Sequence, residues 1–458
     1  MAERPSAREV LALLADDFSE IPYPERRSKP DGPLAWEGYD ASRARAAERT
    51  GEQESVICGT AHVEGTRAVL IAFEFGFLGG SLGERTGDRL EAAYRYAREH
   101  RLPVVPLVAT GGSRMQEGML ALSQLQRVAR ESALTRAAGL PQIAVLRDPT
   151  TGGGWATLGA GADVILALPG AQVGFAGSRV RPPDADPSAY SAQAQVAAGA
   201  ADAVVRPQEL RETLGRWLRL LARPSTGSGD GRSTEPAPAP VPAPLGATGL
   251  PATGWDAVRR ARSPERPRAK AYLDAYFTRR EAVSGDRCGG TDLGMLCGFG
   301  EHAGRTIAYA AQTGTATRPA GYRTAARLIR LADRLGIPVL TLVDTPGAAN
   351  DAEAERQGAG AAIADLFAAV ASVRTPITTL LIGEGGSGGA LALAAPGATY
   401  ATPDSYFSVI APELAAAILK RGPEEVESTA DQLRIRPQDL VELGVVAPFG
   451  ESGRPRHL

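Results

Sequence analysis

LPVVPLVATGGSR (residues 102–114) is the stretch that decides the fold, because it recurs as IPVLTLVDTPGAA (residues 337–349), an offset of 235 residues counted from 102 to 337. The same offset, applied without a gap, relates further positions: Pro141 to Pro376, Gly153 to Gly388, Gly154 to Gly389, and the VGFAG starting at Val173 to the SVIAP starting at Ser408. The chain is therefore an internal duplication. A repeat of this length predicts two similar domains rather than a short-period solenoid.

Each copy alternates helices with short apolar strands. Residues 104–109 and 339–343 are apolar runs entered from a proline, as is typical of strands buried on both faces of a sheet. An amphipathic helix is predicted before each run, and a second strand after it leads into glycine-rich sequence and a small-residue helix. The expected helices are 89–100 and 323–335, and the expected second strands are 142–146 and 378–382. This alternation predicts an α/β fold.

Four glycine turns carry the candidate chemistry. They are residues 111–118 and 148–156 in the first copy and residues 344–348 and 383–392 in the second. Each joins a buried strand to a helix start, where backbone N–H groups have no helical partner. Two adjacent turns would offer converging N–H donors to an oxygen that gains negative charge. Tight strand–helix packing or a phosphate cradle is the alternative for any single turn, but four matching turns favour oxyanion stabilisation.

Side chains that could act as a base or nucleophile are scarce near these turns. None of the four histidines lies in a turn. Ser387 has no histidine partner that the sequence identifies, so we interpret it as a turn residue. Glu117 and Glu384 could act as bases, but each lies beside a helix start, where a carboxylate stabilises the helix dipole. A reaction that forms a carbanion here would therefore need a base brought by a substrate.

Composition narrows the class of protein. The 458 residues are 43% hydrophobic and carry a formal net charge of −2, which is too balanced to suggest nucleic acid as a partner. The three cysteines form no CxxC pair and no disulfide framework, which is typical of a reducing compartment. We find no signal segment and no apolar run long enough to cross a bilayer. A cytoplasmic protein without a membrane partner is the expectation.

The chain divides at a stretch rich in proline, alanine and glycine. Residues 223–254 have almost no large apolar side chains and are predicted to form an extended, solvated linker. The first 36 residues are charged and proline-interrupted, and we expect an N-terminal arm with one short helix. The two domains are therefore placed at residues 37–222 and 255–458.

The turn motifs resemble a known enzyme family. GGSRMQEG, AFEFGFLGGSLG and DPTTGGGWA resemble the β subunit of bacterial acetyl-CoA carboxylase carboxyltransferase, whereas GYRTAARLIRLADRLGIPVLTLVDTPGA, GEGGSGGALA and YFSVIAPE resemble its α subunit. The resemblance covers residues 37–218 and 256–425. It implies a β–α fusion whose two tandem domains have the crotonase (ClpP-like) fold of ββα superhelical turns.

The resemblance also implies an activity and its residues. The family moves CO₂ from carboxybiotin, held on a separate carrier protein, to acetyl-CoA, giving malonyl-CoA through biotin and acyl-CoA enolates in two oxyanion holes. By family position Gly152 and Gly153, with Gly112 and Ser113, would bind the thioester oxygen. Gly389 and Ala390, with Gly347, Ala348 and Gly388, would bind the biotin ureido oxygen, and Arg114 would contact the phosphates of CoA. The internal offset instead favours Gly153 and Gly154 in the first copy.

Several expectations about partners follow from the resemblance. The chain has neither a Met-Lys-Met biotin acceptor nor a GxxxxGK[ST] loop for ATP, so no covalently bound biotin is expected, and a biotin carboxyl carrier protein and a biotin carboxylase would be separate chains. A homodimer or larger even-numbered oligomer is expected. Cys58 is the only cysteine of the first copy, so the four-cysteine zinc ribbon of bacterial β subunits cannot form and no metal is expected. The stretch 179–191 is shorter than in the family.

Three alternatives stay open from the sequence. A malonate or acyl-CoA decarboxylase uses the same fold in the opposite direction. A crotonase-type hydratase or isomerase would need a pair of acidic residues, and no convincing pair is present. A non-catalytic assembly subunit of a carboxylase would keep the fold without the donors.

Overall fold

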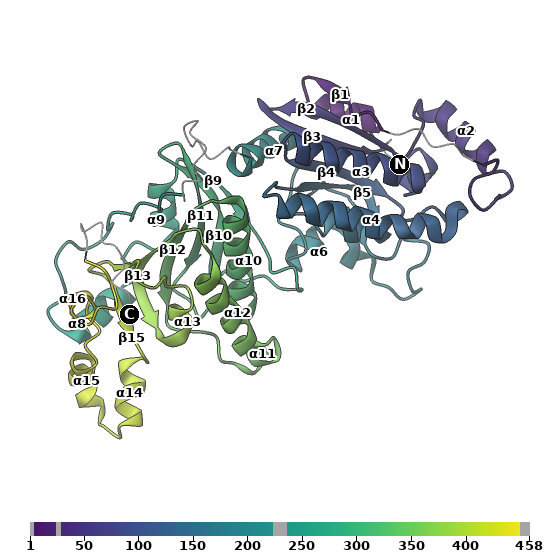
Figure 1. Ribbon diagram of the computed structural model, residues 1–458. Helices are drawn as coiled ribbons and strands as arrows, with labels where there is room; N and C mark the ends of the chain where they lie inside the picture. The colour runs from purple at the N-terminus through teal and green to yellow at the C-terminus, as the bar shows by residue number, and fades with distance from the viewer. Residues whose placement is uncertain (1–3, 24–28, 223–235, 449–458) are drawn as a thin grey trace. The chain divides into compact units, whose positions relative to one another are not determined.

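The computed structural model describes residues 4–23, 29–222 and 236–448 (Figure 1). The chain forms two compact units, Met1–Thr226 and Gly227–Leu458, and each is considered by itself. The division falls within residues 223–235, so that part of the predicted linker lies outside the described residues. Among the helices that the structure describes, none has the length and apolarity needed to cross a bilayer.

The first unit is built on an eight-stranded sheet in the order β1-β2-β3-β4-β5-β6-β8, with β7 paired to β5. The β1–β2 and β2–β3 pairs are antiparallel and the other pairs are parallel. The strands are β1 (Phe18–Glu20), β2 (Val56–Val63), β3 (Thr66–Phe73), β4 (Val104–Thr110), β5 (Ile143–Thr151), β6 (Val164–Ala167), β7 (Val173–Gly174) and β8 (Ala203–Val204). The α-helices are α1 (Ala7–Leu14), α2 (Tyr39–Thr50), α3 (Glu84–Glu99), α4 (Gly118–Ala137), α5 (Gly152–Gly154), α6 (Ala192–Ala197) and α7 (Pro207–Leu221).

The second unit repeats this plan with seven strands in the order β14-β13-β12-β11-β10-β9, and β15 pairs with β13. Its β9–β10 and β10–β11 pairs are antiparallel and the remaining pairs are parallel. The strands are β9 (Arg279–Val283), β10 (Met295–His302), β11 (Arg305–Gln312), β12 (Val339–Thr345), β13 (Ile377–Gly386), β14 (Thr399–Ala401) and β15 (Tyr406–Ser408). The α-helices are α8 (Gly254–Arg262), α9 (Ala269–Tyr276), α10 (Pro319–Leu335), α11 (Ala352–Arg356), α12 (Ala359–Ser372), α13 (Ser387–Leu391), α14 (Pro412–Ile418), α15 (Val426–Gln432) and α16 (Pro437–Glu442).

The predicted α/β fold is confirmed, and the two sheets show why the sequence repeats. β4 and β12 are buried at every residue, as expected of parallel strands covered on both faces. In each unit two long helices lie side by side along the sheet, α3 with α4 and α10 with α12 (Figure 1). The predicted apolar face of α3 is buried, with Leu90, Ala93, Tyr94 and Ala97 in the first core. α10 ends at Leu335, and the next residue, Gly336, has φ 66°, a left-handed conformation that favours glycine.

The N-terminal segment differs from the predicted arm. α1 buries Val10, Leu11 and Leu14, and its Ala7 N–H donates to Glu74 Oε2 at 2.7 Å. β1 then pairs with β2 at the edge of the sheet. The expected short helix is present as α1. The segment is not a separate arm, because the apolar face of α1 is buried in the first unit.

The predicted linker also differs from the structure in its described part. Residues 236–250 form neither helix nor strand and are mostly exposed, as expected, but the segment is not free of the second unit, because Ala239 and Pro242 are buried. Ala239 is buried in the second core, and its carbonyl accepts a hydrogen bond from Thr378 Oγ1 at 2.8 Å. The carbonyl of Pro240 accepts from the Tyr276 hydroxyl at 2.8 Å. Proline and alanine carry little side chain, so an extended backbone can lie close against the second unit and exchange hydrogen bonds with it.

Candidate active site

In the first unit the two glycine turns meet directly. β4 ends at Thr110 and β5 at Thr151, and the glycines that follow are in backbone contact. A Cβ atom on Gly152 would lie 3.1 Å from Gly112 Cα. Gly112 and Gly152 have φ values of 111° and 63°, which side chains disfavour. The sequence therefore needs glycine at both positions for the turns to touch.

The second unit contains the matching contact, and it is tighter. A Cβ atom on Gly389 would lie 2.4 Å from Ala348 N, and one on Gly386 would lie 2.0 Å from the Pro346 carbonyl oxygen. Gly347 has φ 142°. Both candidate sites are thus pairs of turns whose backbones leave no room for side chains between them.

Backbone conformation decides how the two copies align. Gly152 begins α5 with φ 63°, and Ser387 begins α13 with φ 58°. The two positions are related by the internal offset of 235 residues. The shared backbone conformation supports the internal offset, in which Gly153 corresponds to Gly388 and Gly154 to Gly389. The family-based assignment placed the donors of the first copy one residue earlier, at Gly152 and Gly153.

Three of the candidate N–H donors are bonded within the protein. The amide of Gly112 donates to Thr110 Oγ1 at 3.0 Å, and the amide of Gly347 donates to Thr345 Oγ1 at 3.1 Å. The amide of Gly152 donates to the Phe175 carbonyl at 3.0 Å. These glycines were predicted to offer hydrogen bonds to substrate oxygens. In the structure they shape the turns, since their N–H groups bond within the protein.

Ser113 and Ala348 keep their N–H groups available. The peptide groups before and after Ser113 both bond to the backbone of Leu82. Leu82 N donates to Gly112 O, and Arg114 N donates to Leu82 O, both at 2.9 Å. Thr317 bonds in the same way to Gly347 O and Ala349 N. Because successive N–H groups in extended chain point to opposite sides, the amides of Ser113 and Ala348 face away from these partners. Neither amide donates a hydrogen bond to any residue that the structure describes.

The helix starts supply the other candidate donors. The first N–H groups of a helix have no helical acceptor, which applies to Gly153 and Gly154 in the first unit and to Gly388 and Gly389 in the second. Ala390 lies four residues after the N-cap Gly386, whose carbonyl accepts the first hydrogen bond within α13, so the predicted Ala390 donor is engaged in the helix. Gly388 is exposed, and a Cβ atom there would meet no atom within 4 Å. Gly389 and Ala390 are buried beneath it. The open space in front of Gly388 is where a ligand oxygen could approach.

A buried ion pair ties the second pair of turns together. Asp344, at the end of β12, accepts a hydrogen bond from Arg266 Nη2 at 2.6 Å and from Glu384 N at 3.2 Å. Burial raises the pKa of the Asp344 carboxyl, and Arg266 offsets part of this effect. The pair links the turn after β12 to the end of β13.

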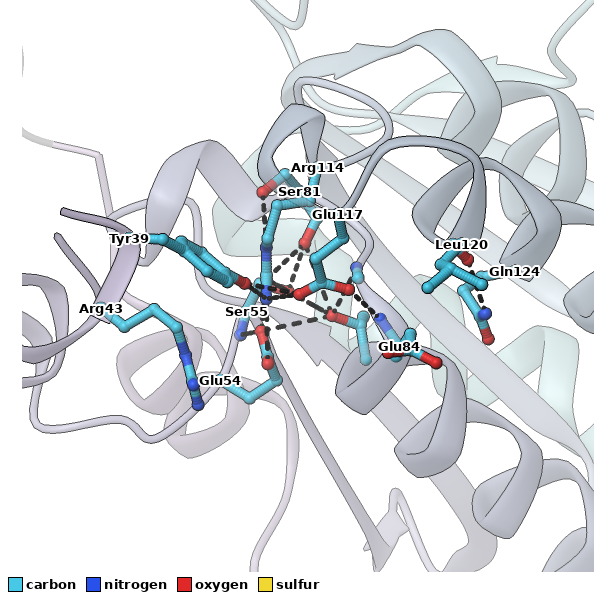
Figure 2. A network of polar contacts seen from close by, with 12 residues as sticks. Tyr39, Arg43, Glu54, Ser55, Ser81, Glu84, Arg114, Glu117, Leu120 and Gln124 are labelled. Carbon is cyan, nitrogen blue, oxygen red and sulfur yellow. Dashed lines mark hydrogen bonds and ion pairs between the residues drawn. The ribbon is translucent and has the colours of Figure 1, made fainter. Parts of the chain in front are cut away.

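Arg114 does not lie where the sequence suggested. It is 1% exposed, and its guanidinium donates to Glu54, to the hydroxyl of Tyr39 and to the carbonyl of Ser81 (Figure 2). Burial alone would raise the pKa of Glu54, but the charge and hydrogen bonds of Arg114 lower it overall. The prediction that Arg114 contacts the phosphates of CoA is therefore wrong. Arg114 fixes the turn that carries Ser113 from inside the fold, because its charge is already paired.

The two glutamates considered as bases are also occupied. Glu117 accepts from the Tyr39 hydroxyl and, at 2.6 Å, from Glu84 N at the start of α3, so it caps a neighbouring helix (Figure 2). Glu384 Oε2 accepts from Arg262 Nε and from the Tyr406 hydroxyl, both at 2.8 Å. Both carboxylates stabilise structure near the turns.

No catalytic serine pair is formed by the described residues. The three described histidines bond elsewhere: His62 to Asp17, His100 to the Tyr96 carbonyl and His302 to the Tyr276 carbonyl. Ser387 thus has none of them as a partner, and its left-handed φ agrees with the interpretation of a turn residue. What the geometry offers is backbone N–H groups at two pairs of turns.

Comparisons with known proteins match both units. Residues 251–449 match the family described as acetyl co-enzyme A carboxylase carboxyltransferase-like, and residues 35–198 match the carboxyl transferase domain. The acetyl-coenzyme A carboxylase carboxyl transferase subunits beta/alpha of Salinispora arenicola is 38% identical, over 95% of this chain and 80% of the relative. The corresponding protein of Saccharopolyspora erythraea is 37% identical, over 89% of this chain and 73% of the relative.

A more distant relative and a solved structure agree with these matches. A probable biotin-dependent acyl-coenzyme A carboxylase beta3 subunit of Mycobacterium bovis is 34% identical, over 90% of this chain and 82% of the relative. The crystal structure of transcarboxylase 12S, a hexamer, superposes with a TM-score of 0.78 at 20% identity and covers 97% of this chain and 85% of that one. This similarity confirms the expected crotonase-like fold.

Proposed function

Because the chain belongs to the acetyl-CoA carboxylase carboxyltransferase family, with its β and α parts in one chain, we propose that it transfers CO₂ from carboxybiotin to acetyl-CoA and forms malonyl-CoA. The observation that carries the proposal is the pair of turns in each unit, where backbones in contact leave amides free to bind an oxygen. Two such pairs suit a reaction in which two different carbonyl oxygens gain charge.

The first unit would bind the acyl-CoA. The N–H of Ser113 and the N–H groups of Gly153 and Gly154 would hold the thioester oxygen as the α-carbon loses its proton. Amides held in a fixed turn need no rearrangement when the negative charge develops, which is why such donors lower the barrier. Arg114 and Glu117 would keep the Ser113 turn in place beneath the substrate.

The second unit would bind the ureido group of biotin. The N–H of Ala348 and those of Gly388 and Gly389, at the start of α13, would hold the ureido oxygen. The open space at Gly388 fits an approaching oxygen. Carboxybiotin supplies the CO₂, and biotin after losing CO₂ supplies the base, so no side-chain base is required. This is consistent with Glu117 and Glu384 being engaged in structural contacts.

The partners follow from this chemistry. A separate biotin carboxyl carrier protein would bring carboxybiotin, and a biotin carboxylase would recharge the carrier. By analogy with the family, the acyl-CoA turns of one protomer would face the biotin turns of another, so a homodimer or a larger even-numbered oligomer would be the active form.

The test is transfer of labelled CO₂ from a carboxylated biotin carrier to acetyl-CoA, with propionyl-CoA compared in parallel. We expect labelled malonyl-CoA to form, with acetyl-CoA preferred. A chain that releases CO₂ from malonyl-CoA but transfers none to acetyl-CoA would instead be a decarboxylase. Failure of both reactions with a carrier shown to be carboxylated would leave the non-catalytic subunit.

A further inference from the structure

We propose that Gln312, Thr317 and Tyr322 form a polar brace that positions the N–H donors of the second unit, and that Tyr322 is a positioning residue for carboxyl transfer. The inference rests on the proposed function, because it concerns the turn pair assigned there to the biotin ureido oxygen. The brace is defined by these three side chains, all of which are 0% exposed.

The brace holds α13 through one carbonyl group. The Gly389 carbonyl oxygen accepts from the Tyr322 hydroxyl at 3.1 Å and from Gln312 Nε2 at 3.2 Å. Leu393 N, four residues later, donates to Ala390 O instead, so side chains replace the usual helical partner of this carbonyl. Because this carbonyl belongs to the first turn of α13, holding it also holds the helix start that carries the N–H groups of Gly388 and Gly389.

The same brace holds the opposite turn. Gln312 Nε2 also donates to Thr317 Oγ1 at 3.2 Å. The backbone of Thr317 pairs with the turn: its N–H donates to Gly347 O at 3.2 Å, and its carbonyl accepts from Ala349 N at 2.9 Å. Ala348 lies between these two bonds. The brace therefore connects the Ala348 amide to the first turn of α13 and sets the separation between the donors.

The first unit lacks this brace at equivalent positions. The internal offset relates Gln312 to Phe77, Thr317 to Leu82 and Tyr322 to Gly87. Leu82 pairs with Ser113 as Thr317 pairs with Ala348, so the backbone arrangement is shared. None of the three first-unit residues can donate a hydrogen bond from its side chain. The polar layer is thus specific to the second unit and is not a requirement of the fold.

The brace leaves one buried polar atom unpaired, which packing alone would not favour. Gln312 Oε1 is buried and has no hydrogen-bond partner among the described residues. A buried unpaired oxygen costs stability, whereas an apolar layer such as Phe77 and Leu82 would avoid the cost. Keeping the polar layer is explained if the orientation of Gly389 and Ala348 matters for the reaction.

The test compares Tyr322→Phe with Tyr276→Phe in the full-length protein. Each substitution removes one buried hydroxyl that donates to a backbone carbonyl, Gly389 O or Pro240 O, from the same unit. We expect Tyr322→Phe to lower kcat for transfer to acetyl-CoA by roughly fivefold, the equivalent of one lost hydrogen bond, with KM for acetyl-CoA unchanged. Tyr276→Phe should leave kcat at the wild-type value.

A second pair of variants and a second readout complete the test. Thr317→Ser keeps the hydroxyl that accepts from Gln312 and should keep more of kcat than Thr317→Val. Hydrogen exchange should speed up at residues 388–392 in Tyr322→Phe and not in Tyr276→Phe. If the wild type transfers CO₂ and Tyr322→Phe changes neither kcat nor hydrogen exchange, the brace proposal is wrong and the proposed function still stands. Absence of transfer by the wild type would overturn the proposed function itself.

Discussion

Gly389 has no space for a side chain, and this makes it the most sensitive single residue of the second unit. A Cβ atom there would lie 2.4 Å from Ala348 N and 2.6 Å from the Tyr322 hydroxyl, so the two turns would have to separate. We predict that Gly389→Ala lowers the free energy of unfolding by about 1–3 kcal/mol, as overpacking does. Activity should fall with it, as measured by thermal unfolding and by CO₂ transfer.

Two other glycines of the second unit, Gly388 and Gly360, provide the comparison for this prediction. Gly388→Ala should fold as stably as the wild type, because no atom lies within 4 Å of its Cβ position. Its activity should still fall, since the methyl group would enter the space of the bound oxygen. Gly360→Ala, on α12 and with equally open surroundings, should leave activity unchanged and should not lower stability, because alanine favours a helix more than glycine does. Wild-type activity in Gly388→Ala would argue against a ligand at this turn.

Arg114 is predicted to be essential for the stability of the first unit. Replacing it with methionine would leave the carboxylate of Glu54, which is 1% exposed, without its partner. Removing one member of a buried ion pair typically costs 3–5 kcal/mol, and we expect about that loss in urea unfolding of Arg114→Met. The matched surface change, Arg211→Met, should leave stability close to the wild-type value, because Arg211 pairs with Asp16 and Glu64 in solvent.

The ion pair of Arg114 and Glu54 should also make the stability of the first unit depend on pH. The pKa of Glu54 is lowered in the folded state, so its stabilising contribution is complete above the unfolded pKa of roughly 4.3 and is lost as the pH falls through the folded pKa. In Arg114→Met, burial without a partner should raise the pKa of Glu54. The difference in stability between wild type and variant should therefore begin to narrow as the pH falls through the raised pKa of Glu54 in the variant, and narrow further below about pH 4, where the wild type loses the contribution of its ionised Glu54. A constant difference down to pH 2 would show that Glu54 is not ionised beside Arg114.

Among the elements, α1 provides the clearest test of how the N-terminal segment is built in. Leu11 is 3% exposed and Leu13 is 62% exposed on the same helix. We predict that Leu11→Ala costs about 2–5 kcal/mol, as for other buried leucines, and that Leu13→Ala costs little. Equal stability of the two variants in denaturant unfolding would mean that residues 7–14 form a detached arm.

Elements with strong periodicity could be predicted from the sequence, and elements held by tertiary contacts could not. The strands at 104–109 and 339–343 and the helix at 323–335 occur within a few residues of their predicted positions. The edge strand β1 has only three residues, and no alternation in so short a segment distinguishes it from a coil. The proline-rich stretch gave no sign of burial, because its contacts with Thr378 and Tyr276 come from far along the chain.

The positions of the glycine turns could be predicted from the sequence, but the roles of individual residues in them could not. Internal repetition located all four glycine turns, but it carried no information on which amides bond within the protein. Whether Gly112 donates to Thr110 or to a ligand depends on a local rotamer, and the role of Arg114 depends on Glu54, 60 residues away. The brace residues were missed because they lie on α10, at the end of β11 and in the loop between them, outside every glycine motif.

At the scale of the whole molecule, each unit should fold by itself and neither should be active alone. We expect residues 1–222 and 236–458, produced separately, to unfold cooperatively, since each contains a complete sheet and core. The second piece should lose stability if it begins at 255, because Ala239 is part of its core. Mixing the two pieces should restore transfer, and activity from residues 1–222 alone would contradict the two-site account.

The measurement that most directly tests the central claim is transfer of labelled CO₂ from a carboxylated biotin carrier to acetyl-CoA by the wild type, Gly153→Pro and Gly389→Pro. Each substitution removes one amide donor, one in each unit. The account predicts transfer by the wild type and loss of kcat in both variants by roughly a hundredfold or more, as for other oxyanion donors. Full transfer by either correctly folded variant, or none by the wild type to any short acyl-CoA, would contradict it.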